Sequence, residues 1–402
     1  MKAIATFAFA LFALGIFAAE IPKAPVPPSP YLPIIYKYAD AMLERGRDTN
    51  GVFHSALNRV TLVPLELRTS GATPQDHQNL LRLLYTLTEL SAKPKYRDAA
   101  DAELRWFLSN ADSRIYLSNQ PWMLWDRCFE IAPEAALRLA VRLTNERLDS
   151  KDVEVFYRQA GFYLRSWAQA YARTREESFL KASDALFDQT EKIRQLGKHA
   201  AFASTLSLSI DCDAASRLVP GTLASRLRAF ADHEDKMFCP LPEWLKSTGA
   251  FVTGGGRRVP PWMTGSGDNT TARIGLMCVS RYENTGSVAY RDLVHAAADL
   301  YLGSLPASDA DAWPMTFGHA ISLQVAAWRS TAQQKYLDRA RELADFAVKH
   351  FFDQGPLPRA SLKSTHYDAG TGADTLALGL VELHLHILAI TAVRYPPNTI
   401  DR

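Results

Sequence analysis

Apolar residues recur at helical spacing along most of the chain after residue 34. The segment 334–352, QKYLDRARELADFAVKHFF, shows this best, because its apolar residues repeat every three to four positions. Three further segments, 95–108, 178–193 and 289–302, carry an aromatic residue near their start and continue with alanine-rich, charged turns. This pattern predicts amphipathic helices that each keep one face in solvent.

A second group of segments is apolar on most sides and alternates along the chain with the first group. These segments span residues 76–90, 155–172, 270–283, 318–330 and 372–388. A helix that is apolar nearly all round is a buried helix. The sequence therefore predicts exposed and buried helices in alternation, with almost no strand.

The connecting segments differ in length according to whether they precede or follow a buried helix. Short connectors follow the buried helices, at 91–94, 174–178, 284–288 and 331–334, and long ones precede them, at 47–74, 237–269, 303–317 and 353–371. All long loops then lie on one face, the long-loop face, which is also where the buried helices begin. Because long loops in compact domains are usually functional, we expect the site on this face. The fold class predicted is all-α, an (α/α)6-type toroid of inner and outer helices in roughly six to seven hairpins, with an open α-solenoid as the alternative.

The N-terminus predicts export to the periplasm or the cell exterior. Residues 3–19 form an apolar run behind Lys2, which is typical of a signal peptide over 1–19, or else of an uncleaved anchor. A proline-rich spacer over 20–33 follows, then the toroid over 34–392 and a C-terminal tail over 393–402. No second apolar run is as long as the roughly 20 residues of a membrane helix, so we expect no membrane-spanning body.

Composition removes several other classes of protein. With 45 Lys and Arg against 43 Asp and Glu, the formal charge of +2 argues against a nucleic-acid partner. The cysteines, Cys128, Cys212, Cys239 and Cys278, have no CxxC spacing, so we expect neither a zinc site nor a disulfide; Cys212–Cys239 is the one pair to test. We expect no cofactor and no metal.

Several segments together resemble a known group of proteins. They include DHQNLLRLLYTLTE, WMLWDRCFEIAPEAALRLA, DAWPMTFGHAISLQVAAWR and LKSTHYDAGTGADTLALGLVELHL. In these the chain is similar to six-hairpin (α/α)-toroid proteins active on carbohydrates, in particular exported bacterial proteins labelled pectate-lyase-like or six-hairpin-glycosidase-like. The resemblance covers about residues 34–392 and implies a glycan groove across the N-terminal ends of the inner helices. It carries no catalytic motif, so it fixes neither the reaction nor the site.

The acid–base candidates are polar residues that we expect near the starts of inner helices. They are His366, Tyr367, His319, His77 and Tyr163. His366 and Tyr367 are the preferred pair, because a histidine and a tyrosine can each move a proton. His77 and Tyr163 have structural alternatives, in a first helical turn and an aromatic core stripe.

The substrate-binding candidates are aromatic and charged residues of the same face. Tryptophan rings can cover sugar faces, and arginines can meet uronate carboxylates. The set comprises Trp122, Trp125, Asp126, Arg127, Arg258, Trp262, Asp268 and Trp313. As alternatives, Trp122 and Trp125 pack in the core, Asp126 and Arg127 form a neighbouring ion pair, and Asp268 or Asn269 caps the helix that starts at Thr270.

These residues predict an enzyme on an acidic polysaccharide or oligosaccharide. The long-loop face is richer in His, Tyr, Trp and Arg than in Asp and Glu, which favours β-elimination of a uronate chain. A glycoside hydrolase with paired carboxylates is the first alternative. A non-catalytic glycan-binding or scaffold protein on the same fold is the second.

Overall fold

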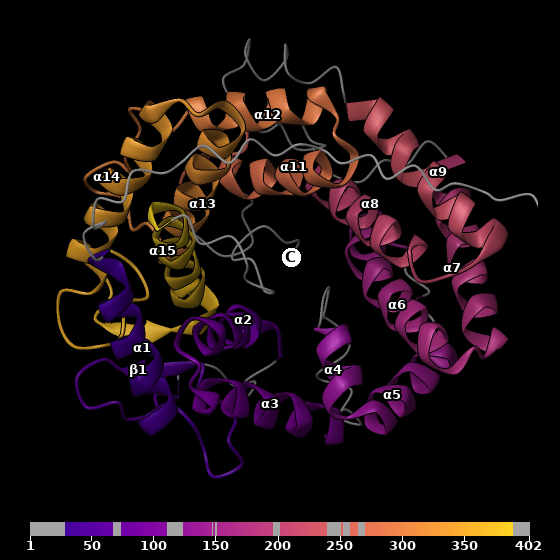
Figure 1. The fold of residues 1–402 in the computed structure, drawn as a ribbon, viewed down its shortest axis with the longest axis horizontal. Coiled ribbons are helices and arrows are strands. Elements are labelled where there is room, and N and C mark those ends of the chain that lie inside the picture. Colours follow the sequence, from indigo (N-terminus) through magenta and orange to yellow (C-terminus); the bar gives the residue numbers. More distant parts are fainter. Residues whose placement is uncertain are drawn as a thin grey trace, which may run out of the picture.

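The computed structural model describes residues 29–66, 74–110, 124–146, 148, 151–195, 202–238, 251, 258–263 and 270–388. Within these residues the chain forms a ring of helices in two layers (Figure 1). The outer layer contains α1 (Tyr31–Arg45), α3 (Pro94–Ser109), α5 (Pro133–Asn145), α7 (Glu177–Gln195), α9 (Gly221–Phe238), α12 (Val288–Asp299) and α14 (Gln334–Phe351). The inner layer contains α2 (Pro74–Ser91), α4 (Trp125–Ile131), α6 (Val153–Thr174), α8 (Phe202–Ser216), α11 (Thr271–Thr285), α13 (Pro314–Thr331) and α15 (Ala373–Ile387).

Burial follows the two patterns of the sequence. In α14, one stripe that includes Tyr336, Ala340 and Leu343 is buried, and the opposite face is solvated. In α13, almost every residue from Pro314 to Ala327 is buried. The predicted alternation of amphipathic outer helices and fully covered inner helices is therefore confirmed.

The ring is closed by contacts between the first and last helices. Tyr31 of α1 donates its hydroxyl proton to Asp345 of α14 at 2.9 Å. On the inner layer, the Asn79 side chain of α2 donates to Thr375 of α15 at 2.8 Å. An open solenoid would leave these two ends apart, so the predicted toroid is confirmed and the solenoid is excluded.

A short antiparallel sheet also joins the two ends of the ring. It pairs β1 (Ala56–Asn58) with β2 (His366–Asp368), with Leu57 opposite Tyr367. The 3-10 helix η2 (Ala369–Thr371) leads from β2 into α15. The sequence placed this segment in an irregular loop, because three-residue strands are too short to show alternation.

Neighbouring outer helices are linked by a recurring tyrosine–aspartate hydrogen bond. The tyrosine lies in the first turn of one outer helix, and the aspartate lies on the outer helix before it in the ring. Besides Tyr31–Asp345, the pairs are Tyr96–Asp40 at 2.8 Å, Tyr290–Asp235 at 2.5 Å and Tyr336–Asp299 at 2.9 Å. This explains why several amphipathic segments open near an aromatic residue.

The structure also describes the starts of α1 and α11 and three of the four cysteines. Helix α1 begins at Tyr31, inside the segment expected to be a spacer. The cap of α11 is Thr270 itself, whose hydroxyl accepts from the backbone N–H of Arg273 at 3.2 Å; Asp268 and Asn269 lie outside the described residues. Cys128, Cys212 and Cys278 are buried free thiols, and Cys239 also lies outside the described residues.

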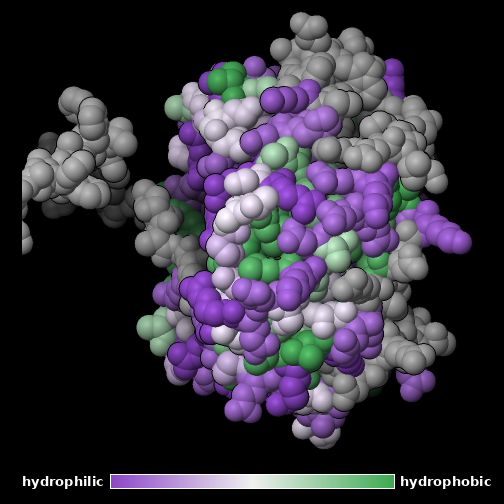
Figure 2. Space-filling view, turned by 90° about the vertical axis from the view of Figure 1, so that its right-hand side faces the viewer, coloured by the Kyte–Doolittle hydropathy of each residue, from purple (hydrophilic) through white to green (hydrophobic). Residues whose placement is uncertain are grey.

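The outer surface is largely polar on the side that can be seen in Figure 2. The side of the ring that carries α7 and α9 presents mostly hydrophilic residues with smaller apolar areas between them (Figure 2). Among the described residues, no helix combines the length and apolarity that crossing a membrane requires.

Candidate functional site

The inner helices α2, α13 and α15 begin on one face of the ring. Near their starts, a Cβ atom on Gly318 of α13 would come within 2.3 Å of the Thr375 carbonyl of α15. Near their ends, the rings of Trp328 and His386 are 5.9 Å apart. Contacts at both ends show that α13 and α15 are parallel, and the Asn79–Thr375 bond places α2 alongside. We call this end of the ring the mouth face; it is the predicted long-loop face.

The segment 258–263 connects α11 to the same face. The Trp313 N–H, just before α13, donates to the Met263 carbonyl at 3.3 Å, and the Thr271 N–H at the start of α11 donates to the Pro260 carbonyl at 3.0 Å. Backbone N–H groups at helix starts carry partial positive charge. The described part of the mouth face therefore combines the positive ends of α2, α11, α13 and α15.

His77 lies near the mouth face but has no exposed surface. Its Nδ1 is 2.6 Å from a carboxylate oxygen of Glu103, which lies on the outer helix α3. The other oxygen of Glu103 accepts from the Phe53 N–H at 3.1 Å, and the Phe53 ring meets the His77 ring edge-on. His77 thus connects an inner helix to an outer helix, which matches its structural alternative.

His366 and Tyr367 point to opposite sides of β2, as consecutive strand residues do. His366 is half-buried, and its Nδ1 is 2.8 Å from the Ser364 hydroxyl, which fixes the ring. Tyr367 is 0% exposed, and its hydroxyl is 3.2 Å from the hydroxyl of Tyr38. Burial raises the pKa of Tyr367 well above its usual value. The expectation that the two form an acid–base pair is corrected: the strand geometry separates them.

Two further acid–base candidates are also packed inside. Tyr163 is buried against Phe162 and Trp167, and burial raises the pKa of its phenol. Its structural alternative, an aromatic core stripe, is the arrangement observed. His319 is 6% exposed on α13, one turn into the helix.

The tryptophan candidates divide between core and surface. Trp125 packs against Phe162 with ring centroids 5.2 Å apart. Trp262 packs against Phe317 at 4.8 Å, and its indole N–H donates to Ser304 at 2.9 Å. Both are buried, so the structure does not place them on the mouth face as sugar platforms. Trp313 remains half-exposed at the start of α13, and Trp122 lies outside the described residues.

The charged candidates have separate surroundings. Arg127 forms an ion pair with Asp101 of α3 at 2.5 Å and a second one with Glu130 at 3.0 Å, so it does not pair with its neighbour Asp126. Asp126 is exposed and accepts weakly from Gln169 of α6 at 3.5 Å. Arg258 is exposed in the segment beside the mouth face. Asp268 lies outside the described residues.

Polar pairs between consecutive inner helices form a feature that the sequence reasoning missed. Arg165 of α6 and Asp211 of α8 are 3.2 Å apart, and Arg329 of α13 and Glu283 of α11 are also 3.2 Å apart. A Cβ atom on Gly161 would lie 1.7 Å from the Asp211 carboxylate, so this glycine makes room for the acid. The sequence signal for this pair is weak: a glycine one turn before an arginine, opposite a helix that carries Asp211 and Asp213.

Glu382 is an acid of an inner helix that is buried without a full set of hydrogen bonds among the described residues. It lies on α15, is 3% exposed, and its Oε2 has no hydrogen-bond partner among the described residues. Burial raises the pKa of this carboxyl to about 7, against the opposing effects of a Ser322 hydrogen bond and the charge of Arg329. A carboxyl group with such a pKa can hold a proton at neutral pH and release it. It was not among the candidates, because sequence periodicity marks α15 simply as a buried helix.

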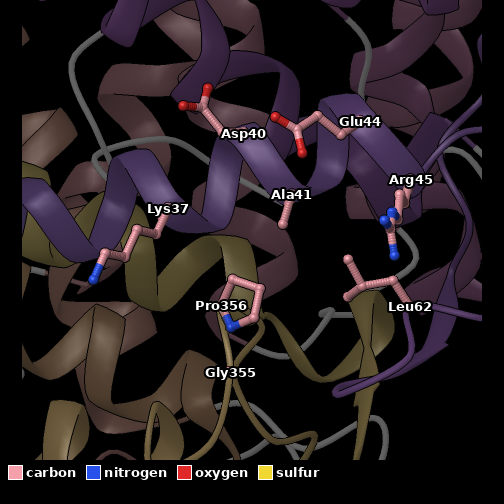
Figure 3. A pocket seen from close by; sticks show the side chains of 8 residues that line it. All are labelled: Lys37, Asp40, Ala41, Glu44, Arg45, Leu62, Gly355 and Pro356. Atoms are coloured by element: carbon pink, nitrogen blue, oxygen red, sulfur yellow. The ribbon is translucent and has the colours of Figure 1, made fainter.

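A pocket lined entirely by residues that the structure describes lies on the outer surface of the ring. It has a volume of about 620 Å³ between α1 and residues 355–356. Lys37, Glu44 and Arg45 extend along one side of it, opposite Leu62 and Pro356 (Figure 3). The inner helices contribute nothing to this lining, so the pocket is separate from the mouth face.

The described residues contain no group of three or more His, Cys, Asp or Glu side chains that could hold a metal ion. His77, His319 and His366 belong to three different local environments.

Comparison with known proteins concerns the fold. No family model and no curated protein matches the sequence. Among solved structures, the cellobiose 2-epimerase from Bacillus thermoamylovorans matches with a TM-score of 0.50 at 11% identity, over 87% of this chain and 99% of that chain. The α-1,6-mannanase from Salegentibacter sp. matches with a TM-score of 0.48 at 11% identity, over 89% and 99%. The unsaturated glucuronyl hydrolase from Streptococcus agalactiae matches with a TM-score of 0.48 at 10% identity, over 87% and 90%.

At 11% identity, the match to the epimerase shows the fold and nothing further. The six-hairpin (α/α) toroid expected from the sequence resemblance is confirmed. The three proteins named are two hydrolases and an epimerase, and none of them is a pectate lyase.

Proposed function

We propose that this protein is an enzyme acting on an acidic carbohydrate, which enters the ring through the mouth face. The observation that carries the proposal is the common start of α2, α11, α13 and α15 on that face. Helix starts attract negatively charged groups, and several on one face act together. The carbohydrate class rests on the sequence resemblance and on the toroid fold that this resemblance implied.

Three side chains of the same face suit such a ligand. Arg258 is exposed and can meet a carboxylate, and Trp313 keeps part of its ring free for a sugar face. His366 is half-exposed and held by Ser364, so it can take or give a proton at the mouth. Together they provide charge recognition, stacking and acid–base chemistry.

The reaction we propose is cleavage of a glycosidic bond by acid–base catalysis. In the β-elimination of a uronate chain that we propose, His366 is the base. Tyr367 and Tyr163 were the other candidates, but both are packed in the core. Hydrolysis stays as the alternative, and the inner-helix acids supply its carboxyl groups. Glycan binding without catalysis is the second alternative, and the same experiment separates it.

The test is to incubate the purified protein with a panel of uronate polysaccharides and the same polymers after reduction of their carboxyl groups. Elimination gives an unsaturated product that absorbs in the ultraviolet, hydrolysis gives new reducing ends, and binding alone gives neither. We expect turnover of the acidic polymers and little of the reduced ones. Binding of neither set, in a folded sample, would refute the proposal.

Two variants connect that activity to the mouth face. We expect Arg258→Ala to raise KM for the acidic polymer, because it removes one charge from the mouth. Arg97→Ala is the matched control, since Arg97 is an exposed arginine on the outer helix α3. Equal effects of both variants would show that overall charge, and not the mouth face, attracts the substrate.

Export is a separate proposal, supported by the apolar run at residues 3–19. We expect the mature protein in the periplasm or the medium after expression in a Gram-negative host. Fractionation that finds the full-length chain in the cytoplasm would contradict it.

A further inference from the structure

We propose that Glu382, inside the ring of inner helices, is the general acid that protonates the leaving oxygen of the substrate. This inference deepens the proposed function and rests on it. It concerns a residue that neither the sequence patterns nor the resemblance pointed to. Four observations carry it, and each concerns a different property of the side chain.

The first observation is the direction in which Glu382 points. The groups that act on its carboxyl come from Ser322 and Arg329 of α13, Glu283 of α11 and Arg82 of α2. All four belong to inner helices, and the outer helices that cover α15 contribute none of these groups. The carboxyl therefore lies on the side of α15 that is turned toward the other inner helices.

The second observation is depth. Glu382 is the tenth residue of α15, which begins at Ala373. At 1.5 Å per residue, it lies about 14 Å along the helix from the mouth face. The carboxyl group is therefore deep in the ring, where a sugar that reached it would be separated from water.

The third observation is an open hydrogen-bonding position. The Oε2 atom is buried and has no partner among the described residues. Buried polar atoms are almost always paired, so an orphaned one calls for an explanation. A substrate oxygen would satisfy it, because a protonated carboxyl donates one hydrogen bond.

The fourth observation is the protonation state that the surroundings impose. Burial raises the pKa of Glu382 to about 7, so a large share of the molecules hold the proton at neutral pH. His386, one turn further along α15, has its pKa lowered to about 4 by burial and by Arg329, so it is neutral there. Of these two groups, Glu382 is the one that carries a proton to donate.

The proposed step transfers one proton and breaks one bond. The proton of the Glu382 carboxyl moves to the glycosidic oxygen, the bond from that oxygen to carbon breaks, and its electron pair stays on the oxygen. Glu382 becomes a carboxylate and takes a proton from water before the next turnover. Water then adds to the carbon and loses a proton, so this step belongs to the hydrolytic reaction.

The experiment compares Glu382→Gln with the wild type on two kinds of substrate. With the natural polysaccharide, we expect the variant to lose kcat by ~10²–10⁴-fold, because glutamine cannot donate the proton. With a nitrophenyl derivative of the same sugar, whose leaving group needs no proton, we expect the loss to shrink to less than about tenfold. A merely structural role would reduce both rates equally.

The control is Glu234→Gln, which makes the same change at a buried glutamate of the outer helix α9. We expect it to retain the wild-type ratio between the two substrates. Thermal melts of all three proteins exclude unfolding as the cause. The fall in wild-type kcat above pH 7 is expected to disappear in Glu382→Gln.

The outcomes separate the two proposals. A wild type that cleaves the polysaccharide, with a Glu382→Gln variant of equal activity, overturns the role of Glu382 and leaves the proposed function in place. A wild type that cleaves none of the substrates overturns both. An infrared difference spectrum between the wild type and Glu382→Gln that shows the Glu382 carboxyl fully ionised below pH 6 would also overturn the role of Glu382.

Discussion

Tyr367 and Glu382 are both buried, but their polar atoms have different surroundings. The Tyr367 hydroxyl meets the hydroxyl of Tyr38 at 3.2 Å, so its hydrogen bond lies within the fold. Glu382 keeps one oxygen without a partner among the described residues. A group whose hydrogen bonds are complete stabilises the fold, and one with an open position is able to meet a ligand.

The first prediction concerns Tyr367→Phe. Removing the hydroxyl leaves Tyr38 with one buried hydrogen bond fewer, which costs about 1 kcal/mol of unfolding free energy. Because Tyr367 has no exposed surface, we expect kcat to stay unchanged. Denaturant unfolding and steady-state kinetics on the same samples test both parts. A ~10²-fold fall in kcat at unchanged stability would return Tyr367 to a catalytic role.

The second prediction concerns the pH dependence of stability at Glu382. The folded-state pKa is about 7, above the ordinary value of 4.5. The folded state therefore holds this proton more tightly than the unfolded state. The contribution of this proton to the free energy of unfolding is fully present below pH 4.5 and is lost as the pH rises toward 7. The change is about 3 kcal/mol, at 1.36 kcal/mol per pKa unit.

Glu382→Gln has no such titration, so its stability relative to the wild type should rise between pH 4 and pH 8. Urea unfolding of both proteins at these two pH values measures the difference. Glu234→Gln again serves as the control. If the gap between wild type and Glu382→Gln stays constant with pH, the carboxyl has an ordinary pKa.

At the scale of elements, periodicity predicted nine of the fourteen helices among the described residues, seven of them to within about two residues at each end. For example, the segment 334–352 corresponds to α14, Gln334–Phe351. The long connectors at 303–317 and 353–371 were also predicted correctly, since the structure describes both of them between an outer and an inner helix. The strands β1 and β2 were not predicted, because three residues carry no readable period.

The same sequence reasoning could place candidates near an inner-helix start, but not the direction in which they point. Successive residues of a helix are rotated by about 100°, so one position decides between the ring interior and an outer helix. His77 points outward to Glu103 of α3, whereas Glu382 points inward. An inner helix is apolar nearly all round, and for that reason its pattern does not reveal which side faces the centre.

The third prediction concerns the contact between α13 and α15. Alanine in place of an exposed helical glycine normally stabilises a helix by about 1 kcal/mol. At Gly318, however, the added Cβ would approach the Thr375 carbonyl to 2.3 Å, and the backbone cannot move aside cheaply. We expect Gly318→Ala to destabilise the fold by about 1–3 kcal/mol or more.

Gly303→Ala is the matched control, because nothing lies within 4 Å of a Cβ atom there. Thermal and chemical unfolding of both variants provides the comparison. A Gly318→Ala protein as stable as Gly303→Ala would mean that α13 and α15 are further apart than the structure shows.

At the scale of the whole molecule, overall charge would not attract the acidic substrate that we propose. The formal net charge is +2, with 45 basic and 43 acidic residues, so the long-range field is weak. In the proposed function, the arrangement of the ring would provide the attraction instead. Parallel inner helices bring several positive helix ends to one face, with Arg258 exposed beside them. Because Arg258 is exposed to solvent, such an attraction would weaken as the ionic strength rises.

The fourth prediction concerns the effect of salt on substrate binding. Raising the ionic strength from about 0.1 M to about 1 M shortens the Debye length from about 10 Å to about 3 Å, which screens the mouth face from an approaching carboxylate. We expect KM for an acidic oligosaccharide to rise several-fold over this range while kcat changes little, because the interior chemistry at Glu382 is buried from salt. The carboxyl-reduced oligosaccharide should show no such change, and Arg258→Ala should flatten the salt dependence where Arg97→Ala does not. A KM that responds equally for the charged and the reduced substrate would mean that salt acts on the protein rather than on recognition, and the mouth face would then have no part in selecting an acidic ligand.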